Sequence, residues 1–110
     1  ALVCLCLLKM NCNASAAYFG MASKACEAQL EALAACKRSL GLQPKQCYPA
    51  KGYKGECDRN EFDLKACNAH AVDPQSARTL YDTSKPRAER VAANQRLQYK
   101  LKPYEKPCTP

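Results

Sequence analysis

The sequence has few of the large apolar side chains that normally build a protein core. It contains no Trp, no Ile and only two Phe, and much of its apolar content is Ala and Cys. A chain of 110 residues with so little core material forms at most one domain, and it usually needs covalent cross-links. The nine cysteines can supply them, and this density indicates an oxidising compartment.

The sequence also lacks the patterns that mark a metal site, a catalytic site or a membrane span. It has one His and no Cys-x2-Cys, so we expect no metal site. It has no nucleophile-elbow, phosphate-loop or metalloprotease motif, and its only closely spaced cysteines, Cys4 and Cys6, lie in an apolar run. We therefore expect no enzyme, no cofactor and no small-molecule substrate. That run, ALVCLCLL, is far shorter than the roughly 20 residues that cross a bilayer.

Four cysteines form two equally spaced pairs. Cys26 and Cys36 enclose nine residues, Cys57 and Cys67 enclose nine more, and both inserts are typical of helix. Ten residues advance a helix by about 15 Å, so the cysteines of a pair lie on one broad face, nearly three turns apart. Antiparallel packing of the two helices brings Cys26 opposite Cys67 and Cys36 opposite Cys57, and both bridges can then close at a Cα separation of about 5.5 Å. We therefore expect an all-α fold, an antiparallel helical hairpin with two disulfides and irregular N- and C-terminal arms.

The limits of the two helices follow from capping and breaking residues. The first is predicted over residues 16–40, because Gly41 suits the C-cap. The second is predicted over residues 55–71, and Asp73 ends it because a residue before proline is pushed out of the helical region. The expected apolar seams consist of Phe19, Ala22, Cys26, Gln29, Leu33, Cys36 and Leu40 in the first helix, and of Cys57, Asn60, Leu64, Cys67 and Ala71 in the second.

A second register competes with this one. Cys47 and Cys57 also enclose nine residues, so they could form the second pair in place of Cys57 and Cys67. The insert would then hold Pro49 and two glycines, each of which costs about 1 kcal/mol in a helix interior. These residues favour Cys57 with Cys67 and leave the alternative open.

The remaining chain is assigned to two arms around the hairpin of residues 16–72. Residues 1–15 form an N-terminal arm, and residues 73–110 a basic C-terminal tail in which Ser84 and Pro86 can open a short helix. The net charge of +7 favours partners with acidic surfaces, among them anionic lipid, RNA or an acidic protein face. The side chains predicted to bind a partner are Arg87, Arg90, Arg96, Lys100 and Lys102. The cysteines left for extra disulfides or free thiols are Cys4, Cys6, Cys12, Cys47 and Cys108.

The paired Cys-x9-Cys helices, with Leu33 and Leu64 each seven residues after the first cysteine of its pair, resemble the twin Cys-x9-Cys or coiled-coil-helix-coiled-coil-helix (CHCH) family. The likeness covers about residues 18–71. Members of that family are imported into the mitochondrial intermembrane space and oxidised there by a disulfide relay. The resemblance implies the same two bridges as the spacing does.

Within that family the sequence looks most like the small accessory subunits of respiratory complex I. Glu56 beside Cys57, the run from Glu61 to Leu64 and the basic tail carry this likeness, whereas the long loop with Cys47 departs from it. The resemblance implies a structural subunit that binds other protein subunits, lies peripherally on the inner membrane and contacts anionic lipid. Alternatives are the VIb-type subunit of cytochrome c oxidase, a mitoribosomal small-subunit protein, which would bind RNA, and a secreted disulfide-rich peptide.

Overall fold

The computed structural model describes residues 18–45 and 54–106, and the regular secondary structure of this part of the chain is helical apart from one pair of two-residue strands. The predicted all-α fold class is confirmed. The elements in chain order are β1 (Tyr18–Phe19), η2 (Lys24–Cys26), α2 (Glu27–Ser39), α3 (Asp58–Val72), α4 (Pro74–Tyr81), α5 (Arg87–Leu101), η3 (Lys102–Tyr104) and β2 (Glu105–Lys106).

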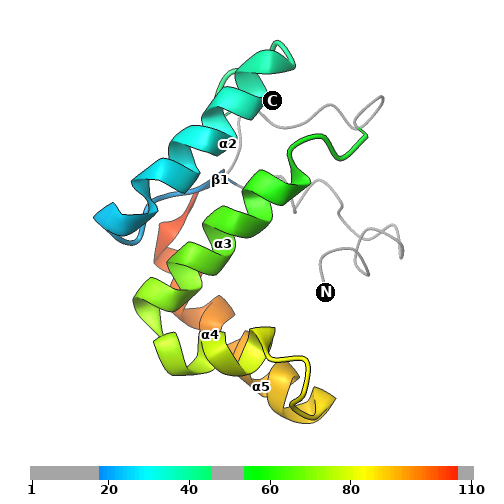
Figure 1. Cartoon of the computed structure of the whole chain (residues 1–110). Helices are drawn as coiled ribbons and strands as arrows, with labels where there is room; N and C mark the ends of the chain where they lie inside the picture. The colour runs from blue at the N-terminus through cyan, green and yellow to red at the C-terminus, as the bar shows by residue number, and fades with distance from the viewer. Residues whose placement is uncertain (1–17, 46–53, 107–110) are drawn as a thin grey trace.

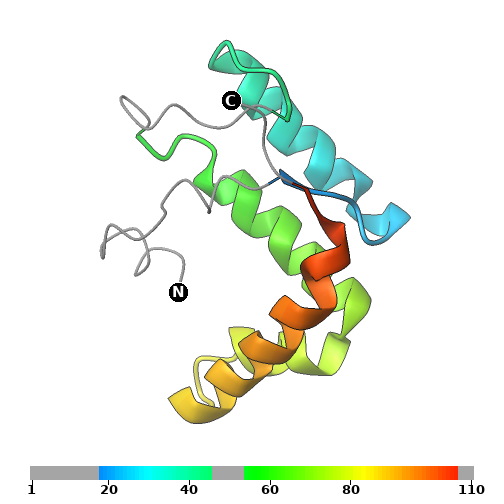
Figure 2. The same cartoon turned by 180° about the vertical axis from the view of Figure 1, so that it is seen from behind.

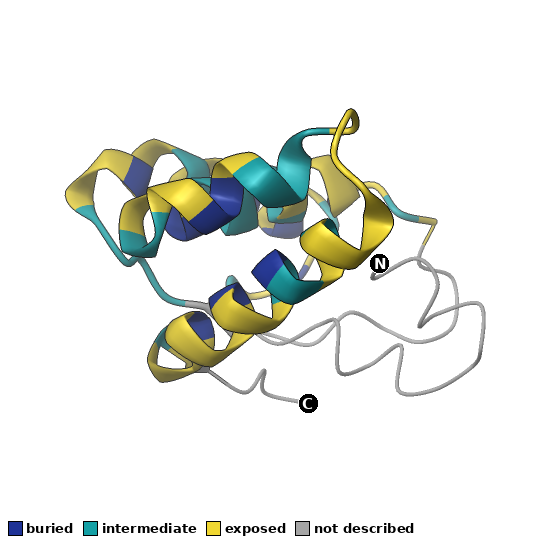
Figure 3. Cartoon of the chain, turned by 90° about the horizontal axis from the view of Figure 1, so that it is seen from below, coloured by how far each residue is buried: buried dark blue, intermediate teal, exposed yellow. Residues whose placement is uncertain are grey.

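Helices α2 and α3 run side by side as the predicted antiparallel hairpin (Figure 1). The seam leucines Leu33 and Leu64 are 3% and 1% exposed, so they form the centre of the hairpin core. Figure 3 shows how the buried positions of each helix form a stripe while the opposite faces are exposed. The buried members of this first core are Cys26, Leu33, Leu42, Cys57 and Leu64.

Helix α2 ends at a glycine in the left-handed region. Gly41 has a φ of 78°, and its N–H donates to the carbonyl of Arg38 at 2.9 Å. The next amide, that of Leu42, donates to the carbonyl of Lys37 at 3.0 Å. These two bonds form a Schellman motif, in which the buried Leu42 folds back onto the core. The predicted helix end at Gly41 is confirmed.

The first helix begins later than predicted. Residues 18–19 form β1, which pairs antiparallel with β2 so that Tyr18 lies opposite Lys106, and the helical backbone starts only at Lys24. Ser23 has an extended backbone, and its side chain accepts from the Ala25 N–H as an N-cap. Phe19 and Ala22 therefore lie before the helix, and their assignment to its seam is wrong.

The second helix begins at Asp58, three residues after the predicted start. Gly55 has a φ of 81°, which no right-handed helix accommodates, and Cys57 stands at the N-cap. The seam also changes near the other end of α3. Ala71 is exposed, whereas Asn68 and Ala69 are buried, because this end of the helix packs on other parts of the chain.

The chain turns sharply at Asp73 and forms a helix that the sequence analysis did not predict. Asp73 ends α3, as expected, and also caps α4, since its carboxylate accepts from the Ser76 N–H at 3.1 Å. Pro74 takes the first position of α4, where its missing N–H is not needed. A single residue thus links α3 to α4.

Helix α5 is the predicted C-terminal helix, and it forms a second hairpin with α4. It begins just after Pro86, as predicted, and ends at Leu101. Its buried side chains include Leu97 and Leu101, whereas Val91 is 44% exposed and lies outside the core. This second core contains Ala69, Ala77, Leu97 and Leu101, so the α4–α5 hairpin packs on the end of α3. Figure 2 shows the chain continuing from α5 past α3 to the strand pair.

Candidate functional site

Two disulfides join the two arms of the hairpin, one near each end: Cys26, the last residue of η2, bonds to Cys67 in α3, and Cys36 in α2 bonds to Cys57, the N-cap of α3. The outer bridge, Cys26–Cys67, has a Cα–Cα distance of 5.7 Å, and the inner bridge, Cys36–Cys57, has one of 5.9 Å. These are the two bridges that the sequence predicted. The alternative register is excluded, because Cys57 and Cys67 both take part in them. The other five cysteines lie outside the described residues, so the prediction for them stays open.

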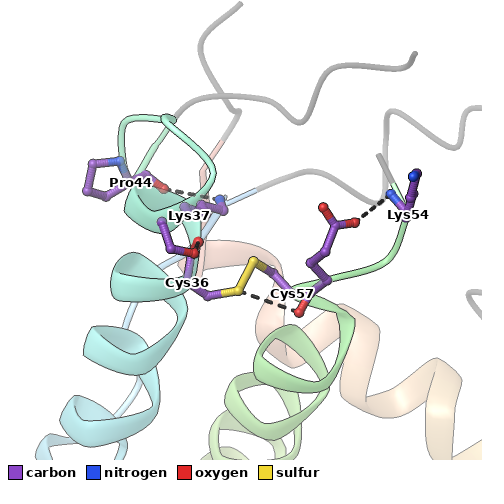
Figure 4. The surroundings of a disulfide bond; sticks show 7 residues. Cys36, Lys37, Pro44, Lys54 and Cys57 are labelled. Atoms are coloured by element: carbon purple, nitrogen blue, oxygen red, sulfur yellow. Dashed lines mark hydrogen bonds between the residues drawn. A yellow bond between two sulfur atoms is a disulfide. The ribbon is translucent and has the colours of Figure 1, made fainter. Parts of the chain in front are cut away.

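The inner bridge lies beside a buried lysine, as Figure 4 shows. Lys37 is 1% exposed, and its ammonium group donates to the carbonyl of Pro44 at 3.1 Å. Burial lowers the pKa of Lys37, and the nearby carboxylate of Glu61 partly opposes this shift. The Cys36 sulfur lies 3.5 Å from the carbonyl oxygen of Glu56. This is a packing contact, because a bridged sulfur carries no proton. Through this bond, Lys37 holds the segment that follows α2, at Pro44, against the C-terminal end of α2.

A buried asparagine holds the N-terminal segment against α3. Asn68 is 0% exposed, and its side-chain amide donates to the carbonyl of Gly20 at 2.9 Å. The same side chain accepts from the Ala22 N–H, also at 2.9 Å. The Asn68 side chain therefore provides residues 20–22 with the donor and the acceptor that a neighbouring strand would otherwise provide. Sequence reasoning missed it, because a polar residue within a helical pattern gave no sign of a partner more than forty residues away.

Three of the five basic residues predicted to bind a partner also make contacts within the C-terminal hairpin. The Arg90 Nε donates to the carbonyl of Leu80, and the Arg96 Nε donates to the Ser76 hydroxyl, each at 3.0 Å. Lys100 pairs with Asp73 at 2.9 Å. Arg87 is exposed at the start of α5, and Lys102 is exposed at the start of η3. The structure therefore gives part of the basic charge a role in holding α4 to α5, and partner binding by these residues stays a prediction.

Asp73 is the polar centre of that hairpin. Its carboxylate accepts from Lys100 and from both the hydroxyl and the backbone N–H of Ser76. The bond from Lys100, followed by those from Ser76, holds the pKa of Asp73 well below the usual range for a carboxyl group. These bonds join the first turn of α4 and the last turn of α5 to the residue that ends α3.

Aromatic side chains gather where α3 faces α4, in a cluster we call the aromatic patch: Phe62, His70 and Tyr81. Tyr81 lies between the other two, with ring centroids 5.5 Å from Phe62 and 6.0 Å from His70. Burial raises the pKa of Tyr81. Phe62 is 49% exposed, and the Arg59 guanidinium lies 6.0 Å from its ring centroid. His70 is exposed near the end of α3 and stacks on Tyr81.

Within residues 18–45 and 54–106, no group of three His, Cys, Asp or Glu side chains is arranged to hold a metal ion. The expectations of no metal and no cofactor remain predictions. Among the helices in these same two ranges, none has both the length and the apolar character needed to cross a membrane.

Comparison with protein-family models, with curated proteins and with solved structures finds no match to this chain. The structure itself shows a two-disulfide helical hairpin that is consistent with a CHCH-like fold.

Proposed function

We propose that the protein is a non-catalytic structural accessory subunit of a mitochondrial inner-membrane respiratory complex, and that this complex is complex I (NADH:ubiquinone oxidoreductase). One observation carries the proposal. The outer and inner bridges join both ends of an antiparallel hairpin whose cysteine spacing and seam leucines resemble the CHCH pattern. In this proposal the protein lies in the intermembrane space, peripheral to the inner membrane.

Such a subunit would act as a rigid clip between neighbouring subunits. Each bridge restricts the unfolded chain, which stabilises a small domain by about 3–4 kcal/mol for a loop of this size. A second hairpin, α4–α5, packs on the first and exposes Arg87 and Lys102. These cations suit an acidic face of a neighbouring subunit or the headgroups of anionic lipids.

The test is native-gel separation of detergent-solubilised mitochondrial membranes, with the chain located by mass spectrometry and its disulfides mapped in the same band. We expect co-migration with NADH dehydrogenase activity, with the outer and inner bridges both formed. Depletion of the chain should also reduce the amount of assembled complex in that gel.

Other outcomes would redirect the proposal. Co-migration with cytochrome c oxidase would indicate a VIb-type subunit, and co-migration with ribosomal proteins would indicate RNA binding, whose affinity should fall steeply with salt. Absence from mitochondria would overturn the proposal, and a secreted disulfide-rich peptide would then be the remaining alternative.

A further inference from the structure

One face of the α2–α3 hairpin carries a groove beside the outer bridge. It consists of two hollows, of about 550 Å³ and about 180 Å³, which adjoin because Gln29 and Asp63 line both of them. On α3 the lining runs from Asn60 to Ala71, which corresponds to about 16 Å along the helix axis. We call this surface the alanine groove, after the small side chains that line it: Ala25, Ala28, Ala32, Ala66 and Ala71.

The dimensions of the alanine groove suit an α-helix. A length of about 16 Å matches about three turns of helix. Alanine side chains are short, so a third helix can approach the backbones of α2 and α3 closely and pack in the channel between them. An occupant of this kind would convert the hairpin into a three-helix arrangement and cover the exposed side of the outer bridge.

One polar atom in the middle of the alanine groove lacks a hydrogen-bond donor, and a carboxylate lies opposite it. The Gln29 Oε1 atom is buried, and nothing in the described part of the chain donates to it. A buried acceptor without a donor costs about 1–3 kcal/mol, which a donor from outside would recover. Asp63 lies across the same point and is paired at 3.2 Å with Arg59, whose side chain is 83% exposed. Such an exposed pair contributes little, so another cation can replace Arg59 at that carboxylate.

We propose that the alanine groove is the docking site for an α-helix of a neighbouring protein, and that this helix places an Arg or Lys side chain against Gln29 and Asp63. The charge argues for this occupant over an anionic lipid, because a headgroup phosphate would meet the Asp63 carboxylate. The inference rests on the proposed function in one respect, since it takes the neighbour to be a subunit of the same complex.

The test uses the full-length oxidised protein, labelled with nitrogen-15, and two alanine-based helical peptides of about 16 residues. One peptide carries a central Arg and the other a central Met. We expect saturable shifts of amide signals at Ala28, Gln29 and Ala66, and binding of the Arg peptide about tenfold tighter than that of the Met peptide. Asp63→Asn should remove most of that preference.

A matched pair of tryptophan variants tests the location. Ala32 lines the groove and Ala88 lies on α5, and both are exposed helical alanines, so either substitution should leave the fold intact. Ala32→Trp should weaken binding of the Arg peptide at least about tenfold, and Ala88→Trp should leave it unchanged. Absence of saturable shifts, shifts confined to α5 or to Phe62 and Tyr81, or equal affinities for both peptides would overturn the proposal.

The same variants separate this inference from the proposed function. If the wild-type chain co-migrates with complex I and Ala32→Trp does so equally well, the groove inference fails while the function stands. If the wild-type chain does not co-migrate and the purified protein still binds the Arg peptide in the groove, the function fails while the docking site stands.

Discussion

Replacing Asn68 by alanine should destabilise the protein more than its polar character suggests. The change removes two hydrogen bonds of 2.9 Å and leaves the Gly20 carbonyl and the Ala22 N–H without a partner beside the core. Each bond contributes about 0.5–1.5 kcal/mol, and each buried group left unpaired costs about 1–3 kcal/mol. Because both backbone groups are only partly buried and water can reach them, we expect a loss of about 2–4 kcal/mol.

The matched control is Asn94→Ala in α5. Asn94 is half-buried, and its side chain accepts a bond of 3.3 Å from the exposed Gln98, so its loss should cost less than about 0.5 kcal/mol. The gain in helix propensity from Asn to Ala is the same at both positions, so the difference between the variants isolates the contacts of Asn68.

Urea unfolding of the oxidised variants measures this difference, and hydrogen exchange of the Ala22 amide reports on the segment that Asn68 holds. In Asn68→Ala that amide should exchange much faster than in the wild type, and the melting temperature should fall by about 10–25 °C. A difference between the two variants below about 0.5 kcal/mol, or an Ala22 amide that keeps its protection, would refute the reasoning.

Three further predictions concern the bridges, the glycine turns and the response to acid. Replacing both cysteines of either bridge by alanine should cost about 3–4 kcal/mol in urea unfolding, and a loss below about 1 kcal/mol would contradict the loop-closure argument. Gly55→Ala should destabilise more than Gly41→Ala. Both glycines have positive φ, but a Cβ at Gly55 would lie 2.8 Å from the Asp58 carboxylate, whereas one at Gly41 meets nothing within 4 Å. Equal losses would show that this contact is relieved at no cost. Because the pKa of Asp73 is lowered in the folded protein, its contribution to stability is present above about pH 4 and is lost as the pH falls below that value. Asp73→Asn keeps a side chain that can cap α4, so it should flatten the decline in unfolding free energy between pH 5 and pH 2, and an unchanged decline would exclude this role.

The features that depend on local spacing could be predicted from the sequence. The equal inserts of nine residues between paired cysteines indicate which cysteines face each other. The helical spacing of the apolar seam likewise predicts that Leu33 and Leu64 lie in the core. The end of α2 also follows from one residue, because a glycine there can adopt a positive φ.

The features that depend on distant contacts could not be predicted. Residues 16–23 are rich in alanine and suggest helix, yet Tyr18–Phe19 pair with β2 as a strand, and Gly20 and Ala22 bond to the Asn68 side chain. The helical backbone therefore starts only at Lys24. Helix α4 is a different case. Asp73 followed by Pro74 is a recognisable N-cap and first position, so the signal was present and was interpreted only as the end of α3.

The candidate site shows the same limit. Composition identified the basic residues of α5, but it could not indicate that Arg90 reaches the carbonyl of Leu80 or that Arg96 reaches Ser76. The alanine groove had no sequence signal either, because alanines on a helix do not reveal which of them will face a partner helix across a channel.

The outer bridge also determines how the domain transmits tension. Tyr18 and Lys106 lie opposite each other in the strand pair, so opposing pulls on the two ends of the described chain would separate β1 from β2 one hydrogen bond at a time. Beyond that point the pull passes along the chain to Cys26, crosses the disulfide to Cys67 and continues through α4 and α5. Residues 27–66 are bypassed by a covalent bond, so no stretching force reaches them while the bridge is intact. Most of the hairpin is thereby removed from the extensible length of the molecule.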